Sequence, residues 1–222
     1  MTTNPQEYLQ RRWERPPGAT EVLLVRHGAS AAAVDGQLFP LVDGHGDPPL
    51  SSLGLEQAEQ LARRLATVAV DALFVTTLTR TRQTAAPLAR RLGLEPVVVP
   101  ELREVLLGEW EGGVFRINVQ AGHPLALRMV QEERWDVIPG AEPMEAFAGR
   151  VADGLRTVVA ATGPDATAVA VVHAGVIAEA CRQATGSRPF AFTSSENGSI
   201  TRLVSAGGPF RLHSFNETAH LD

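Results

Sequence analysis

The sequence predicts an α/β fold, a three-layer α/β/α sandwich around a mainly parallel sheet. Short runs rich in Val, Leu and Ala alternate along the chain with segments whose apolar residues recur at helical spacing. The runs are apolar at nearly every position, as in parallel strands that helices cover on both faces. We therefore expect one domain over residues 21–222, with a lid-like insertion at about 108–144 and a flexible lead-in over 1–20.

The first half of the chain predicts three strands and two helices. Ser51 or Ser52 can cap a helix that runs to Leu65, and Gly93 ends a second helix over residues 79–92. The intervening stretch from 34 to 49 is rich in Gly, Asp and Pro, which indicates a loop. The expected strands of this half share an apolar, β-rich composition: residues 21–25, 72–76 and 96–99.

The second half begins with a less regular segment, 108–144, that is richer in Gly, Trp and Pro. We expect one short helix in it, at about 124–135. Two longer helices are expected over 145–161 and 175–184, and Gly207 and Gly208 form a turn between the last two strands. The strands expected in this half are residues 168–172, 199–204 and 210–214.

Composition excludes several classes of function. All 20 basic residues are Arg, so a Schiff-base lysine, a P-loop lysine and a lysine general base are excluded. The net charge of −5 argues against a nucleic-acid partner, which usually requires a basic surface. The single cysteine, Cys181, excludes an internal disulfide and a Cys-rich zinc site.

No targeting or membrane signal stands out. Residues 1–20 are polar and lack the apolar core of a signal peptide. No apolar run approaches the roughly 20 residues that a membrane span needs. We expect a soluble, cytoplasmic protein without membrane partners.

Charged residues follow each of the expected parallel strands. They are Arg26 and His27, then Arg80, then Arg103 and Glu104, and finally His173. Because ligands bind at the carboxyl ends of such strands, these side chains should meet at one rim. Arg binds phosphate, neutral imidazole is a nucleophile near pH 7, and a carboxyl group can protonate a leaving oxygen. The set therefore predicts phosphoryl transfer through a histidine.

Six segments, in order, resemble motifs of the histidine phosphatase superfamily, also called the phosphoglycerate mutase-like family. They are 24–28 (LVRHG), 47–54 (DPPLSSLG), 78–85 (LTRTRQTA), 102–112 (LREVLLGEWEG), 172–175 (VHAG) and 215–221 (FNETAHL). An Arg-His-Gly triplet alone is a weak signal, whereas six ordered matches from 21 to 221 are a strong one. The resemblance implies the phosphoglycerate mutase-like fold and a phosphomonoester hydrolase that needs no metal or other cofactor.

The resemblance also implies a role for each matching residue. His27 would attack phosphorus and become phosphohistidine, and Glu104 would protonate the leaving oxygen and later activate water. Gly28 would leave room for the phosphate and orient the imidazole through its carbonyl. The phosphate-binding residues would be Arg26, Gly28, Ser30, Arg80, His173 and Ala174.

The sequence departs from the family pattern after Ser30, where Ala31, Ala32 and Ala33 replace the Trp and the phosphate-supporting Asn of many members. Hydrolysis is favoured over mutase chemistry for another reason: the glycolytic mutases carry a Tyr, a Lys and an Arg pair for a bisphosphate, whereas this chain has no Lys and has Leu106-Leu107-Gly108 in place of a basic and aromatic segment. The expected partner is a small phosphorylated substrate, with a homodimer left open. We expect the insertion to cover the pocket mouth, and its Leu, Met, Val and Trp content indicates a partly apolar leaving group.

Two other functions remain as alternatives. Asp43, His45 and Asp47 could ligate a divalent metal in a metallohydrolase, although a surface loop is favoured because no second ligand cluster supports the metal. In a loop, His45 could still reach the pocket rim. A non-catalytic module could keep the phosphate pocket without turnover, but the motif keeps all of its charged residues.

Overall fold

The structure is a computed structural model that describes residues 8–222. Its central sheet has six strands in the order β5-β4-β6-β1-β7-β8. Strands β1, β4, β5 and β6 are parallel to one another, whereas β7 is antiparallel to both β1 and β8. The expected mainly parallel sheet is confirmed. Its strands are β1 (Thr20–Arg26), β4 (Ala72–Val75), β5 (Val97–Val98), β6 (Thr167–Val172), β7 (Ile200–Ser205) and β8 (Arg211–Glu217).

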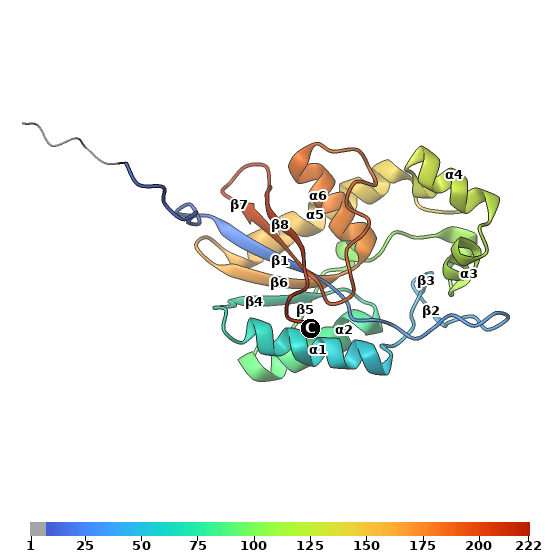
Figure 1. Ribbon diagram of the computed structural model, residues 1–222, viewed down its shortest axis with the longest axis horizontal. Helices are drawn as coiled ribbons and strands as arrows, with labels where there is room; N and C mark the ends of the chain where they lie inside the picture. The colour runs from blue at the N-terminus through green and yellow to red at the C-terminus, as the bar shows by residue number, and fades with distance from the viewer. Residues whose placement is uncertain (1–7) are drawn as a thin grey trace, which may run out of the picture.

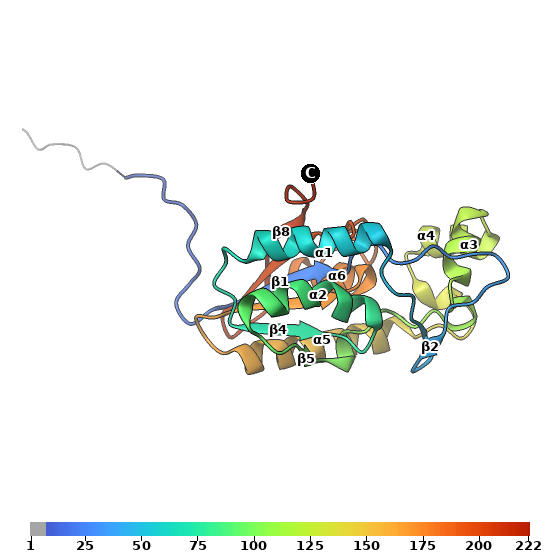
Figure 2. The ribbon, with the colours of Figure 1, turned by 90° about the horizontal axis from the view of Figure 1, so that it is seen from below.

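Four helices cover the sheet, in two layers (Figures 1 and 2). Helices α1 (Ser52–Leu65) and α2 (Thr79–Leu92) lie on one face, and α5 (Met144–Thr162) and α6 (Ala174–Thr185) on the other. Successive residues of β1 alternate between the layers: Leu23 and Val25 pack toward α1 and α2, and Val22 and Leu24 toward α5 and α6. All six residues of β6 are buried, which explains their continuous apolar sequence.

The ends of two helices follow the sequence closely. Ser51 caps α1, since its hydroxyl accepts a hydrogen bond from the Gly54 N–H at 3.2 Å. Helix α2 ends at Gly93, whose φ of 67° lies in the left-handed region that glycine adopts without strain. Both helices thereby begin and end where the sequence predicts.

Two irregular segments hold more structure than the sequence predicts. The loop expected at 34–49 contains a hairpin of two-residue strands, β2 (Leu41–Val42) and β3 (His45–Gly46), joined by Asp43 and Gly44 with positive φ. The helix expected at about 124–135 is present as α4 (Pro124–Glu132), but the insertion also holds α3 (Val114–Gln120), which was not predicted. The strands are too short to show alternation, and α3 follows a glycine pair that itself indicates a loop.

Short 3₁₀ turns border the insertion: Pro100–Leu102, Gly108–Trp110 and Trp135–Val137. The insertion surrounds a small core of its own, formed by Trp110, Ala126, Met129 and Ile138. With the β2–β3 hairpin, it lies at the end of the molecule toward which β1 runs (Figure 1). It therefore stands beside the carboxyl ends of the parallel strands, where ligands are expected.

The described part of the lead-in is tied to the domain by two side chains. Arg15 donates hydrogen bonds to the Ala166 carbonyl and the Thr167 hydroxyl, both at 3.0 Å, and the ring of Trp13 lies 4.1 Å from that of His213. Residues 1–7 of the expected flexible lead-in lie outside the described residues. Between residues 8 and 222, no helix combines the length and apolarity needed to cross a membrane.

Candidate active site

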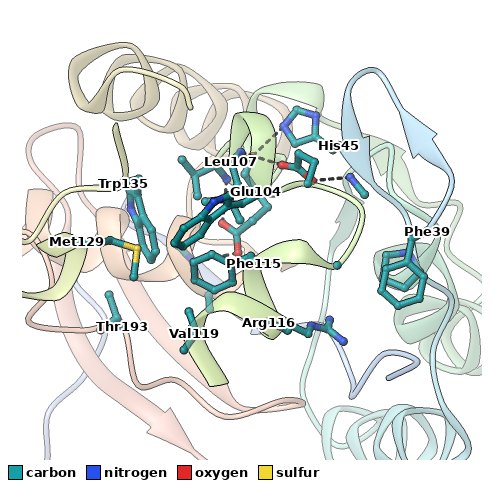
Figure 3. Close-up of a pocket in the computed structure, with 18 of the residues that line it drawn as sticks. Phe39, His45, Glu104, Leu107, Phe115, Arg116, Val119, Met129, Trp135 and Thr193 are labelled. Atoms are coloured by element: carbon teal, nitrogen blue, oxygen red, sulfur yellow. Dashed lines mark hydrogen bonds between the residues drawn. The ribbon is translucent and has the colours of Figure 1, made fainter. Parts of the chain in front are cut away.

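A cavity of about 410 Å³ opens at the carboxyl ends of the parallel strands (Figure 3). Five of the residues expected at the site line it: Arg26, His27, Arg80, Glu104 and Ala174. His173 is fully buried next to them, with its ring 5.2 Å from that of His27 in an edge-on arrangement. Side chains from β1, α2, the 100–104 turn and the β6–α6 junction therefore meet, as the rule for strand ends predicts.

The imidazole of His27 has a defined tautomer. Its Nδ1 lies 2.8 Å from the Gly28 carbonyl, which can only accept, so Nδ1 carries the proton. The lone pair is then on Nε2, which accepts a hydrogen bond from Arg80 Nε at 3.2 Å. The Asn197 amide donates to the His27 carbonyl at 2.9 Å and fixes the backbone. The reactive nitrogen is thus held in place beside a guanidinium.

Burial keeps this imidazole neutral. The pKa of His27 lies well below its ordinary value of 6.5, first because burial disfavours the imidazolium and then because Arg80 and Arg26 repel it. A neutral imidazole whose Nε2 carries no proton is a competent nucleophile. The same two guanidinium groups would attract an anionic ligand.

Arg80 is held by the hairpin and by the start of α2. Its guanidinium donates to the Gly46 carbonyl at 3.0 Å and lies 3.9 Å from an Asp47 carboxylate oxygen. That carboxylate also accepts from the Thr79 N–H at 2.8 Å and the Thr79 hydroxyl at 2.6 Å. Asp47 thereby connects the hairpin to the helix that carries Arg80.

Two buried nitrogen atoms at the site have no hydrogen-bond partner within residues 8–222. They are Nδ1 of His173 and Nε of Arg26. The other ring nitrogen of His173, Nε2, lies 3.1 Å from the Thr76 hydroxyl, and another guanidinium nitrogen of Arg26 donates to the Ser195 carbonyl. Burial, followed by repulsion from Arg80, lowers the pKa of His173, so it also stays neutral. Unpaired buried donors are unfavourable unless a ligand satisfies them, and phosphoryl oxygens can do so.

Glu104 is fixed through both its carboxylate and its backbone. The carboxylate oxygens accept from the N–H groups of Val105 at 3.0 Å and Gly175 at 3.2 Å. The Glu104 carbonyl accepts from Arg150 at 2.8 Å and lies 3.1 Å from His45 Nε2. Arg150 also donates to the carbonyls of residues 101 and 103 and forms a two-point ion pair with Glu142. A single guanidinium therefore anchors the turn that carries Glu104.

Gly28 and Ser30 do not contact the phosphate site in the way that the sequence predicts. The Gly28 carbonyl does orient the imidazole, but the space beside its Cα is filled: a Cβ there would lie 2.5 Å from the Gly54 carbonyl oxygen. Glycine is needed for the close approach of α1 rather than to make room for phosphate. The Ser30 hydroxyl accepts from Arg116 at 2.6 Å and is not part of the cavity wall.

Arg116 is the site residue that sequence reasoning missed. It projects from α3, lines the cavity and also donates to the Ala31 carbonyl at 2.8 Å. Burial lowers its pKa. No motif contains it, and α3 itself was not predicted. The one signal was the loss of the usual Asn after the Arg-His-Gly triplet, which leaves this side of the site to another polar group.

The alternative metal ligands are engaged elsewhere. The Asp43 carboxylate pairs with Arg103 at 2.6 Å, and the Asp47 carboxylate with Thr79. Both ring nitrogens of His45 lie 3.1 Å from carbonyl oxygens, although the ring does reach the cavity wall. In the part of the chain that the structure describes, no three His, Cys, Asp or Glu side chains are grouped to hold a metal ion.

Comparison with known proteins agrees with this geometry. The family model of the histidine phosphatase superfamily (branch 1) matches residues 22–218. An adenosylcobalamin/alpha-ribazole phosphatase of Escherichia coli is 36% identical over 88 residues, which cover 40% of this chain and 41% of that protein. A probable phosphoglycerate mutase of Yersinia enterocolitica is 31% identical over 136 residues, covering 60% and 54%. The chain thus spans about half the length of these curated relatives.

A solved structure extends the likeness over nearly the whole chain. The native structure of a mycobacterial glucosyl-3-phosphoglycerate phosphatase superposes with a TM-score of 0.72 and 26% sequence identity. The match covers 90% of this chain and 100% of that one. The similarity therefore includes the insertion as well as the sheet.

Proposed function

The chain belongs to the histidine phosphatase superfamily, and from this premise we propose that it hydrolyses phosphomonoesters through a phosphohistidine on His27. One observation carries the proposal: the lone pair of a buried, neutral His27 lies at the cavity, held beside Arg80. A nucleophile so placed can react with a bound phosphoryl group without prior deprotonation.

In the first step, His27 Nε2 attacks phosphorus while the bond to the leaving oxygen breaks. Arg26, Arg80 and His173 Nδ1 donate to the phosphoryl oxygens, where negative charge is concentrated in the transition state. Glu104 gives its proton to the leaving oxygen, so the product departs as a neutral alcohol. The phosphoryl group is then attached to the enzyme.

In the second step, water attacks the phosphohistidine. Glu104, now ionised, takes a proton from that water, and the N–P bond breaks to release inorganic phosphate. His27 regains its lone pair and Glu104 its proton. The cycle uses the same carboxyl group as acid and then as base, and no step requires a metal.

Hydrolysis fits this cavity better than mutase chemistry, although several relatives are named as probable phosphoglycerate mutases. A mutase must hold a doubly phosphorylated intermediate and return its phosphoryl group to a second hydroxyl. Among residues 8–222, the cavity wall contains one guanidinium besides those of Arg26 and Arg80, that of Arg116. The chain has no Lys. Segment 108–144 acts in this proposal as a lid that contacts the leaving group of a small phosphorylated substrate.

Hydrolysis of p-nitrophenyl phosphate tests the proposal. The wild-type protein, His27→Ala and the control His213→Ala, whose ring stacks on Trp13 away from the cavity, are each assayed with and without EDTA. We expect activity that resists EDTA, persists in the control and is lost in His27→Ala. Activity that EDTA abolishes and that His27→Ala retains would instead support a metallohydrolase. Binding of inorganic phosphate without turnover would support the non-catalytic module.

A further inference from the structure

The cavity has two chemically different ends. The imidazole of His27 and the guanidinium groups of Arg26 and Arg80 lie at the strand ends, whereas the part formed by the insertion is mostly apolar, with Glu111 and Arg116 as its charged residues. Figure 3 shows Trp135 and Met129 facing the side of the cavity on which Phe115 and Val119 lie. The apolar wall consists of Leu107, Trp110, Phe115, Val119, Met129 and Trp135.

The aromatic rings of this wall support one another. Trp135 packs on Phe190 with ring centroids 4.5 Å apart, and Phe115 lies 6.3 Å from Trp135 and 6.2 Å from Trp110. Such distances are typical of favourable aromatic pairs. Met129 and Trp110 are 4% and 5% exposed, so they belong to the small core of the insertion as well as to the wall. The apolar surface is therefore formed before a ligand binds, which reduces the entropy lost on binding.

The polar groups near the wall are already engaged in the protein. The Glu111 carboxylate accepts from the Gly46 N–H at 2.6 Å and the Leu107 N–H at 2.8 Å. Arg116 donates to the loop after β1, through Ala31 and Ser30. A second anionic group on a substrate would lie near the carboxylate of Glu111, and it could bind only those N–H groups of Arg116 that Ala31 and Ser30 leave free. An uncharged ring would displace only loosely held water from apolar surface.

We propose that the substrates of this protein are phosphomonoesters of alcohols that carry an apolar ring and no further negative charge. This inference rests on the proposed phosphatase function and adds the substrate class. The phosphate occupies the charged end, and the ring lies against the wall formed by Phe115, Met129 and Trp135. The cavity volume of about 410 Å³ is within the range of small-molecule sites.

The test compares three esters of primary alcohols: 2-phenylethyl phosphate, glycerol 1-phosphate and 3-phosphoglycerate. Because all three release a primary alcohol, differences in kcat/KM report contacts with the rest of the leaving group. Contacts of an apolar group with a pocket are usually worth about 10–200-fold in kcat/KM. We expect 2-phenylethyl phosphate to exceed glycerol 1-phosphate by at least about tenfold and 3-phosphoglycerate to be the poorest substrate.

Three variants locate the effect. Phe115→Ala should lower kcat/KM for 2-phenylethyl phosphate about tenfold more than that for glycerol 1-phosphate, and the activity that remains toward glycerol 1-phosphate shows that the variant is folded. Val119→Asn changes the wall at a position that is 44% exposed, where folding is not at risk, and should act in the same direction. Leu127→Ala, on the outer side of α4 and 64% exposed, should change neither substrate.

Each outcome decides the matter. A ring preference that Phe115→Ala and Val119→Asn reduce supports the inference. Equal rates for the three esters, a preference for 3-phosphoglycerate, or a ring preference that both wall variants keep would overturn it and leave the phosphatase function standing. If no ester is hydrolysed, including p-nitrophenyl phosphate, the proposed function fails and the inference fails with it.

Discussion

Replacing Gly175 by Ala should displace the proton donor without removing it. Gly175 is in the first turn of α6, and a Cβ there would collide with Oε1 of Glu104. The next nearest atoms are Glu104 Cδ at 3.3 Å and Phe147 Cζ at 3.6 Å, so the carboxylate is the group that must move. The phosphate-binding side chains are not among these contacts.

The size of the effect can be worked from this geometry. A displacement of about 1 Å in a catalytic group lowers the rate about 100-fold, within the range of about 10²–10⁴ that a general acid contributes. The free energy of unfolding should fall by about 0–2.5 kcal/mol, the difference between two opposing effects. Ala stabilises a helix by about 0.5–1 kcal/mol relative to Gly. The lost hydrogen bond from the Gly175 N–H to Glu104 destabilises by about 1–3 kcal/mol.

The assay is kcat/KM, which reports formation of the phosphoenzyme, for two substrates. Glycerol 1-phosphate has a poor leaving group and needs the acid, whereas p-nitrophenyl phosphate has a good one. We expect the first value to fall about 100-fold and the second by about tenfold or less. Gly149→Ala, in helix α5 with no atom within 4 Å of the added Cβ, is the matched control. Equal losses for both substrates, or none, would refute the assignment of Glu104 as the acid.

Three further predictions concern charge and positioning. His27 must be neutral to attack, and its pKa is depressed. We therefore expect kcat/KM to fall on the acid side only below pH 6.5. A pH–rate profile whose acid limb lies at or above pH 6.5 would contradict the role of His27. His27 and His173 bind protons more readily when unfolded, so the free energy of unfolding should be constant above pH 6.5. Below pH 6.5 the free energy of unfolding should decline by about 1.4 kcal/mol per pH unit for each histidine. Urea titrations at pH 7 and pH 5 can measure this decline. If the decline with pH is the same in His27→Ala as in the wild type, protonation of His27 is not its cause. Arg150→Met should lower kcat about tenfold with little change in KM, because the substitution releases the turn that carries Glu104. The control is Arg156→Met, which removes an exposed ion pair with Asp153. A change confined to KM would count against a positioning role for Arg150.

The parallel strands could be predicted because burial on both faces of the sheet gives them a recognisable apolar sequence. Strand β6 is buried on both faces, so every position after Thr167 is apolar, and the residue after the strand, His173, stands out. The hairpin β2–β3 could not be predicted in this way, since two-residue strands have no period. Yet the hairpin supplies the Gly46 carbonyl that holds Arg80.

The prediction of the site depended on strand direction. The residues directly after the parallel strands include most of the groups that meet at the cavity. Strand β7 runs the other way, so the residues before it reach the same edge: the Ser195 carbonyl binds Arg26, and the Asn197 amide binds the His27 carbonyl. A sequence does not state which strands are reversed. Arg116 was missed for a different reason, because only the folded insertion brings α3 to the loop after β1.

The small core of the insertion has an evolutionary consequence. Trp110 and Met129 pack in a small cluster that meets the core on the α5–α6 face at Leu107 and Trp135, and members of this cluster form the apolar wall. Substitutions at Trp110, Phe115 or Met129 therefore change contacts within the insertion, while the residues of the sheet that align His27 keep theirs. New leaving groups are accessible through changes in one short segment. The chemistry and the choice of substrate can be selected almost independently.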